Sequence, residues 1–429
     1  MSARQEINRG YVEYLRTISA PAPNSAQSPP RKSSFLKNCL RPVWRLVRPV
    51  LQFVRTLCMF VSLCVTACLL LLCLKVGGWF RRRPLPALHQ EALTHIEKFV
   101  RQYPFHFYPL LCKTLELVYL RQSLAELATG ATRVVELAIG DGTLSSKIYP
   151  EGVRIVALDI SPYSLRSSAK MPHVARAVIA DCLAPPLADG SFDLLVSNNF
   201  LHHVTDKNQT LENMAKIARQ AIFNENTTYW ASAWPRPFLL RKLGLHRMAE
   251  RATARIADQA LQSLKSRAEV DELIGRHYRV ISSAAYFHEV TYFFCGVFSR
   301  LMGCYGPPMP ADLKRFVLNT PLVNMLSLWL TTALARALVI FDASRDPAGA
   351  VFISYTCESV YTGGSSQGEL VCPGCRVLLQ SPPQCPQCNR DFDTVAGMCF
   401  VLPTELEFIR QQYVPGDVAV HTGSSQEHH

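Results

Sequence analysis

The segment from Val134 to Thr143 constrains the fold more than any other part of this 429-residue chain. A short apolar run, Val-Val-Glu-Leu-Ala, leads into Gly140-Asp-Gly142, and residues 143–148 can then open a helix. Glycine allows backbone conformations that a Cβ forbids, and it lets a ligand approach closely. The pattern therefore predicts a strand, a tight turn and a helix that hold a nucleotide-like cofactor.

Three later apolar runs each end in an acid or an amide. The runs are residues 153–159, ending in Asp159; 178–181, ending in Asp181; and 192–198, ending in Asn198. The carboxyl ends of parallel strands share one edge of a sheet, so these side chains are expected to border one site. An acid after the second strand can bind a ribose diol through two charge-assisted hydrogen bonds. A nicotinamide-binding fold is the alternative.

These motifs resemble the class I S-adenosylmethionine-dependent methyltransferases, in particular the group with a Glu-Leu-x-x-Gly-x-Gly first motif, over residues 95–235. The resemblance implies an α/β fold with a Rossmann-like seven-stranded sheet over residues 90–360, and S-adenosyl-L-methionine as the cofactor. The cofactor-binding residues that it implies are Glu136, Ala138, Gly140, Gly142, Asp159, Ile160, Asp181, Cys182 and Asn198. Ala138 stands where the family usually has glycine, and we expect this small-for-small change to leave the pocket intact.

The resemblance also assigns parts of the cofactor to these residues. It implies that Glu136 and the two glycines shape the methionine end, and that Asp159 holds the ribose. Asp181 and Cys182 would face the adenine, while Asn198 and Asn199 would border the sulfonium.

Few obligatory catalytic residues are expected, because a sulfonium is already a good leaving group and the protein mainly supplies alignment. His202 and His203 follow the fourth apolar run, and an imidazole there could accept a proton from a hydroxyl or an amine. A histidine that packs below the cofactor is the better supported interpretation.

Positive charge is concentrated in the N-terminal part of the chain. Residues 1–83 hold 14 Lys and Arg against Glu6 and Glu13, which equals the whole chain's net charge of +12. Nucleic acid is therefore not an expected partner of the remaining, neutral part, and phospholipid headgroups are favoured. Residues 1–50 are predicted to form a disordered basic tail, because they include a stretch rich in Pro, Ser and Ala without apolar periodicity.

Residues 51–80 are predicted to form a membrane-anchoring helix. Residues 56–74 carry no charge, and at about 1.5 Å per residue they are just long enough to cross a hydrocarbon core of about 30 Å. Basic residues flank both sides, so charge alone does not orient the helix. Because the implied cofactor is a cytosolic metabolite, we expect a single-pass protein with its catalytic domain facing the cytosol. Interfacial insertion and a targeting segment are the alternatives.

The later part of the methyltransferase region departs from the family pattern. The usual Leu-Lys-Pro-Gly-Gly turn before the fifth strand is absent, and residues 227–234 are predicted to be that strand. Residues 237–276 are predicted to be long, charged helix. Strands six and seven are predicted at residues 278–284 and 350–356. Between them lies an apolar insertion at about 285–345, whose residues 321–341 are expected to lie on the bilayer or roof the active site, because Arg336 disfavours a second span.

Two Cys-x-x-Cys pairs lie near the C-terminus, Cys372 with Cys375 and Cys385 with Cys388. Four thiolates at this spacing suit structural, tetrahedral Zn²⁺. Residues 368–405 resemble a small zinc-ribbon family found as an activating subunit of methyltransferases or fused to them, and residues 406–429 are predicted to be a tail.

These features favour a membrane-anchored methyltransferase that acts on an oxygen or nitrogen of a lipid or other hydrophobic acceptor. A protein or RNA methyltransferase is one alternative. A membrane-bound scaffold that retains the fold without turnover is another. The oligomeric state is left open.

Overall fold

The computed structural model describes residues 85–101, 107–127, 131–204, 206–226, 235–259, 267–301, 321–361, 369–380 and 383–413. The predicted basic tail, residues 1–50, and the predicted membrane helix, residues 51–80, lie outside these ranges. None of the helices within the described ranges combines the length and the apolar character that a bilayer crossing requires.

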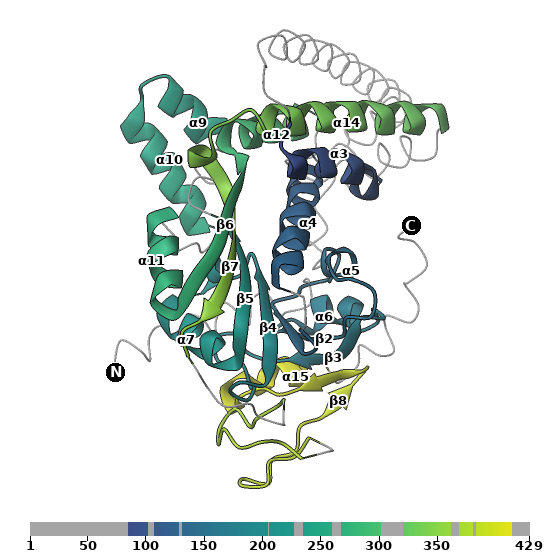
Figure 1. The fold of residues 1–429 in the computed structure, drawn as a ribbon, viewed down its shortest axis with the longest axis vertical. Coiled ribbons are helices and arrows are strands. Elements are labelled where there is room, and N and C mark those ends of the chain that lie inside the picture. Colours follow the sequence, from purple (N-terminus) through teal and green to yellow (C-terminus); the bar gives the residue numbers. More distant parts are fainter. Residues whose placement is uncertain are drawn as a thin grey trace, which may run out of the picture.

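The described residues form one nine-stranded sheet in the order β6-β7-β5-β4-β1-β2-β3-β9-β8 (Figure 1). The strands are β1 Val134–Leu137, β2 Ile155–Asp159, β3 Val174–Ile179, β4 Phe192–Asn198, β5 Ala218–Asn226, β6 Tyr278–His288, β7 Ala350–Ser359, β8 Thr394–Val395 and β9 Met398–Phe400. Strand β7 is antiparallel to both of its neighbours, and the strands from β5 to β9 along the sheet are parallel. The seven strands from β6 to β3 are the predicted Rossmann-like α/β sheet.

Helices cover both faces of the sheet, which explains why β1 and β2 are buried at every position. The helices used below are α3 Ala87–Val100, α4 Phe107–Leu127, α7 Lys207–Ile217, α9 Pro235–Lys242, α10 His246–Gln259, α11 Arg267–His277, α12 Glu289–Leu301, α14 Pro321–Asp342 and α15 Glu407–Tyr413. One apolar core cluster joins one face of the sheet to α3, α4 and α14. A second cluster joins the other face to α7 and α11.

The predicted position of the fifth strand was wrong. Strand β5 is Ala218–Asn226 and starts directly where α7 ends, while residues 227–234 lie outside the described ranges. The polar residues of this strand interrupt the apolar run that would have indicated it in the sequence. Two of them, Asn224 and Glu225, are nevertheless fully buried. They are tolerated because each is hydrogen-bonded, Asn224 to Asn198 and Glu225 to the backbone that follows β4.

The charged region after β5 is three helices, not one long helix. Gly244, with a φ of +75°, separates α9 from α10, and α11 begins at Arg267. The predicted strands six and seven correspond to β6 and β7, and the insertion between them contains α12 and α14. Figure 1 shows α9, α12 and α14 in a row at one end of the molecule, where β6 ends. The insertion therefore lies near the carboxyl edge of the sheet.

The C-terminal Cys-rich segment is part of the main sheet and not a separate appendage. Strand β9 pairs in parallel with β3, with Val178 opposite Cys399. The predicted tail from residue 406 was also wrong at its start, because α15 extends to Tyr413, and Ile409 and Tyr413 are buried in the core. The free edge of β3 supplied a template for β9, which the sequence of β9 alone could not indicate.

Candidate active site

The turn between β1 and the following helix has the geometry that its glycines predict. Gly140 and Gly142 have φ values of +61° and +70°, in the left-handed region. A Cβ on Gly142 would lie 2.8 Å from side-chain atoms of Met171 and Ser168, whereas a Cβ on Gly140 would meet nothing within 4 Å. The turn is thus packed from one side at Gly142 and open at Gly140, as a ligand-binding turn requires.

Ala138 also adopts a positive φ, +53°. A left-handed conformation costs a residue with a Cβ about 1–2 kcal/mol, and glycine avoids this cost. The exchange of glycine for alanine was expected to be innocuous, but the backbone here is strained. Such strain persists where the surroundings hold the backbone in place, and it is frequent at ligand sites.

Asp159 ties the end of β2 to this turn. Its Oδ2 accepts the Gly140 N–H at 2.8 Å, its Oδ1 accepts the Ser161 N–H at 2.8 Å, and the Ile160 N–H also donates to it. Burial raises the pKa of the carboxyl, and these backbone donors oppose the rise. The two carboxylate oxygens together have four lone-pair directions, so the three backbone donors leave one that can accept a ribose hydroxyl. The carboxylate and the open side of Gly140 together fit the nucleoside part of S-adenosylmethionine.

Glu136 supports the turn through residues that follow it, and its place at the methionine end stays a prediction. Its buried carboxyl accepts hydrogen bonds from Ser145 Oγ at 2.6 Å and Tyr149 OH at 2.8 Å, so it fastens the segment after the turn. Burial raises its pKa to about 7, although both hydrogen bonds act in the opposite direction. Glu136 therefore shapes the turn from behind.

The raised pKa of Glu136 predicts a pH-dependent stability. Between about pH 4.5 and 7 the folded state holds a proton that the unfolded state releases, so the free energy of unfolding falls as pH rises, by up to about 3 kcal/mol. Glu136→Gln removes this titration. In thermal unfolding scans, we expect the melting temperature of the variant minus that of the wild type to increase from pH 5 to pH 8. Parallel pH profiles would contradict this assignment.

The end of β3 lies against the same turn. Asp181 Oδ1 accepts the Leu183 N–H at 2.9 Å, and the buried Cys182 thiol accepts a hydrogen bond from the Ala138 backbone. Burial raises the pKa of this thiol well above its usual value, so it is a packing group and not a nucleophile. Both residues were predicted at the adenine, and the structure places them beside the turn.

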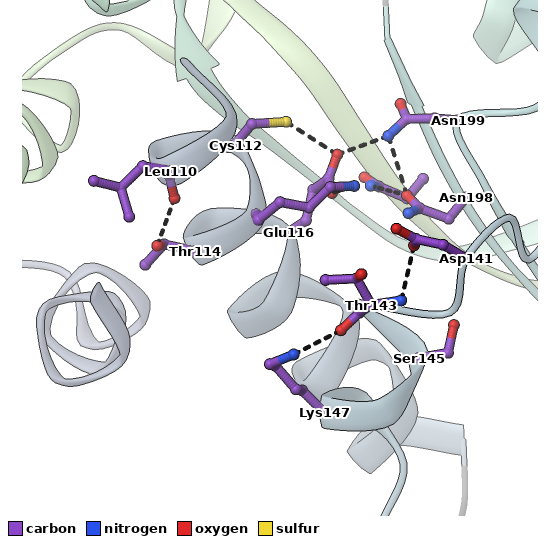
Figure 2. A network of polar contacts seen from close by, with 12 residues as sticks. Leu110, Cys112, Thr114, Glu116, Asp141, Thr143, Ser145, Lys147, Asn198 and Asn199 are labelled. Atoms are coloured by element: carbon purple, nitrogen blue, oxygen red, sulfur yellow. Dashed lines mark hydrogen bonds and ion pairs between the residues drawn. The ribbon is translucent and has the colours of Figure 1, made fainter. Parts of the chain in front are cut away.

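A polar network crosses the ends of β4 and β5 (Figure 2). Asn198 Oδ1 accepts from Asn224 Nδ2 at 2.6 Å, and Asn199 Nδ2 donates to Glu116 Oε1 at 2.6 Å. Asn199 has a φ of +55°, and its buried Oδ1 has no partner among the described residues. The place predicted for the sulfonium thus carries strain and an unused acceptor.

Glu116 was missed by the sequence reasoning. It is fully buried in α4, where Lys113 Nζ donates to Oε2 at 2.9 Å and the Cys112 thiol to Oε1 at 3.1 Å. Figure 2 shows it directed from α4 toward Asn199. An acid within residues 115–120, which are otherwise apolar, was the available signal, since such a group is buried only with partners.

The two histidines after β4 occupy different environments. His202 is buried, and its Nδ1 lies 3.4 Å from the buried Glu225. Glu225 also accepts the backbone N–H groups of Phe200 and Leu201 at 3.0 and 2.9 Å. His203 is exposed. This arrangement favours packing for His202, and a catalytic role for either histidine remains a prediction.

The four cysteines form a second candidate site. The Sγ atoms of Cys372, Cys375, Cys385 and Cys388 all lie within 4.8 Å of one another. Zn–S bonds of about 2.3 Å in a tetrahedron place sulfurs about 3.8 Å apart, and the Sγ atoms of Cys372 and Cys388 are 3.8 Å apart. The donor set and its size fit Zn²⁺.

The two Cys-x-x-Cys pairs have the same backbone shape. The carbonyl of Cys372 accepts the Arg376 N–H at 2.8 Å, and the carbonyl of Cys385 accepts the Asn389 N–H at 2.9 Å. Arg376 and Asn389 have φ values of +59° and +56°. Two equivalent turns thus direct four thiols to one point. Arg376 also donates to the carbonyls of Pro185 and Leu187, which ties the metal site to the loop after β3.

Comparisons with known proteins agree with this fold. Residues 135–221 match a family model described as a methyltransferase domain. The malonyl-[acyl-carrier protein] O-methyltransferase of Pseudescherichia vulneris is 33% identical over 86 residues, which are 20% of this chain and 34% of that protein. The chain therefore spans about a third of the length of this curated relative.

The solved structures found by comparison include two methyltransferases. The geranyl diphosphate C-methyltransferase of Streptomyces coelicolor A3(2) is 11% identical, with a TM-score of 0.35 over 56% of this chain and 76% of that one. An S-adenosylmethionine-dependent methyltransferase from Mesorhizobium loti is 17% identical, with a TM-score of 0.33 over 57% and 97% of the two chains.

Proposed function

We propose that this protein is a membrane-anchored methyltransferase that transfers the methyl group of S-adenosyl-L-methionine to an oxygen or nitrogen of a lipid or other hydrophobic acceptor. The proposal depends mainly on one observation, the hydrogen bond from the Gly140 N–H of the turn to the Asp159 carboxylate. This arrangement lies within the methyltransferase domain and offers a carboxylate and an open backbone surface to one ligand.

The described residues would align the reactants. The bound cofactor supplies an electrophilic methyl group on a sulfonium. Asp159 would fix the ribose through its remaining acceptor position, and the strained turn at Ala138 and Gly140 would lie along the methionine part. Asn199 and Glu116 would present acceptor oxygens where the methyl group points, which suits a hydroxyl or amine that must lose a proton.

Aromatic packing under the insertion supports an apolar acceptor. Tyr108 of α4 stacks on Phe287, with ring centroids 6.1 Å apart, and contacts Tyr292 of α12 at 4.9 Å. These rings join the start of α4 to the insertion near the carboxyl edge of the sheet. The curated relative is named for a methyl acceptor carried on acyl-carrier protein. The aromatic packing favours an apolar substrate over a nucleic acid, and the name of the relative favours oxygen as the methylated atom.

The Zn²⁺ site would have a structural role. Four protein thiols leave no open coordination position for water or substrate. Because β9 follows the second Cys pair and extends the sheet at β3, the bound metal would hold β9 in place against β3.

The localisation is part of the proposal and depends on the sequence of residues 51–80. Their uncharged run with basic flanks favours a single-pass anchor, with the methyltransferase domain on the cytosolic side.

Labelled methyl transfer tests the acceptor. Membranes that contain the protein are incubated with methyl-labelled S-adenosylmethionine and then separated into lipid, protein and RNA. The proposal expects label in the lipid extract and none with Asp159→Ala. Label confined to protein or RNA would establish the alternative enzyme class, and cofactor binding without label in any fraction would indicate a scaffold.

A further inference from the structure

Large apolar side chains are exposed at one end of the molecule. Seven of the twelve exposed large apolar side chains in the described ranges lie on α9, α10, the turn between them, and α14. Four are grouped within ten residues: Leu239 is 50% exposed, Leu243 72%, Leu245 45% and Met248 50%. On α14, Met325 and Trp329 are 63% and 62% exposed. Such a concentration marks an interaction surface.

The turn between α9 and α10 is ordered around its exposed leucines. Leu243 N–H donates to the Leu239 carbonyl at 3.0 Å, and Leu245 N–H donates to the Leu240 carbonyl at 2.9 Å. Gly244 takes the positive φ that closes this turn. The backbone therefore holds Leu243 and Leu245 outward, and their exposure is a property of the folded hairpin.

Basic residues are frequent in the same segment as these leucines. Residues 235–259 contain six Arg and Lys against Glu250 and Asp258, a net charge of +4. Arg241 is paired with Glu289 at 2.5 Å. The other five are exposed and form no ion pair with another described residue: Arg236, Lys242, Arg247, Arg251 and Arg255. Apolar side chains among unpaired cations match the headgroup region of an anionic bilayer.

The position in the chain agrees with this partner. Helix α3 contacts α14, with Arg336 of α14 lying 3.3 Å from Glu97 of α3. Only residues 75–86 separate the uncharged run from α3, and they can reach at most about 40 Å. An anchor at residues 56–74 would thus keep this end of the molecule near the membrane. The ribbon strand β8 lies at the opposite end in Figure 1.

We infer that the α9–α10 hairpin, residues 235–259, docks on the surface of an anionic phospholipid bilayer with Leu243 and Leu245 inserted among the headgroups. The inference rests on the proposed membrane function and adds a second contact to the anchor. This contact would turn the carboxyl edge of the sheet, where cofactor and acceptor meet, toward the lipid. A lipid acceptor could then reach the site without crossing water.

Site-specific photocrosslinking tests the docking. The full chain is reconstituted in vesicles of phosphatidylcholine and phosphatidylserine with p-benzoylphenylalanine at Leu243. The same probe at Leu378, an exposed residue of the Cys-rich ribbon, is the matched control. We expect lipid adducts at position 243 and none at 378. Absence of lipid adducts at 243, or adducts there with a second copy of the chain in place of lipid, would overturn the inference.

Charge reversal separates docking from anchoring. Lys242→Glu, Arg247→Glu and Arg251→Glu together should reduce the lipid adducts at position 243 by on the order of tenfold, because each cation near an anionic surface contributes to binding. Undiminished adducts would contradict the electrostatic part of the inference. Binding of S-adenosylmethionine, measured on the same proteins by calorimetry, should be unchanged. If neither the wild type nor the variant binds the cofactor while lipid adducts form at position 243, the proposed methyltransferase activity is contradicted and the inferred docking is supported.

Discussion

Asp159→Ala is expected to weaken the binding of S-adenosylmethionine at least tenfold. The change removes a charge-assisted hydrogen bond to the ribose that contributes about 1.5–3 kcal/mol, so the dissociation constant should rise by on the order of ten- to a hundredfold from this contact alone. It also removes the acceptors of the Gly140 and Ser161 N–H groups, which loosens the turn itself. Isothermal titration calorimetry with S-adenosylmethionine measures the loss.

Asp193→Ala is the matched control. Asp193 is also an acid of the same sheet, but it lies at the start of β4 and accepts the Thr132 and Arg133 N–H groups at 3.0 and 2.9 Å. Its loss should lower stability without changing cofactor affinity. Equal loss of affinity in both variants would mean that Asp159 acts only through the fold.

Removal of Zn²⁺ is expected to destabilise the protein strongly. Structural zinc binds with apparent free energies of about 10–16 kcal/mol in zinc-finger peptides, and loss of even part of this should lower the melting temperature by about 10 °C or more. Cys385→Ser should reduce the bound zinc from one ion per chain to none. Metal analysis and thermal unfolding give the two readouts.

Cys399→Ser provides the control for the metal site. Cys399 is buried on β9 but is not one of the four clustered cysteines. This variant should keep its zinc and lose little stability. Two results would contradict a structural metal site: a folded protein that contains no zinc when purified, or a melting temperature that does not change when zinc is removed by a chelator.

The sequence predicted the part of the fold whose signals are local. The turn at Gly140 requires glycine for conformational reasons, and β1, β2 and β4 are apolar runs that are recognisable because both faces of a parallel sheet are buried. The place of Asp159 at the end of an apolar run was enough to predict it as a binding residue. These features depend on neighbouring residues in the chain, so the sequence displays them.

The missed parts depend on contacts between distant residues. Strand β5 contains Asn224 and Glu225, which are buried because Asn224 is hydrogen-bonded to Asn198 of β4 and to Tyr286 of β6, and Glu225 to the backbone after β4. Strand β9 is three residues long and is defined by its pairing with β3. Glu116 is about 80 residues from Asn199 in sequence yet bonded to it. Local pattern cannot reveal such pairings, because the compensating partner is supplied only by the folded chain.

Determination of the structure with bound S-adenosylhomocysteine would test the central claim most directly. We predict that a ribose hydroxyl lies within hydrogen-bonding distance of the Asp159 carboxylate, with the sulfur near Asn198 and Asn199. A ligand bound away from the Gly140 turn, or no ligand at saturating concentration, would contradict the account.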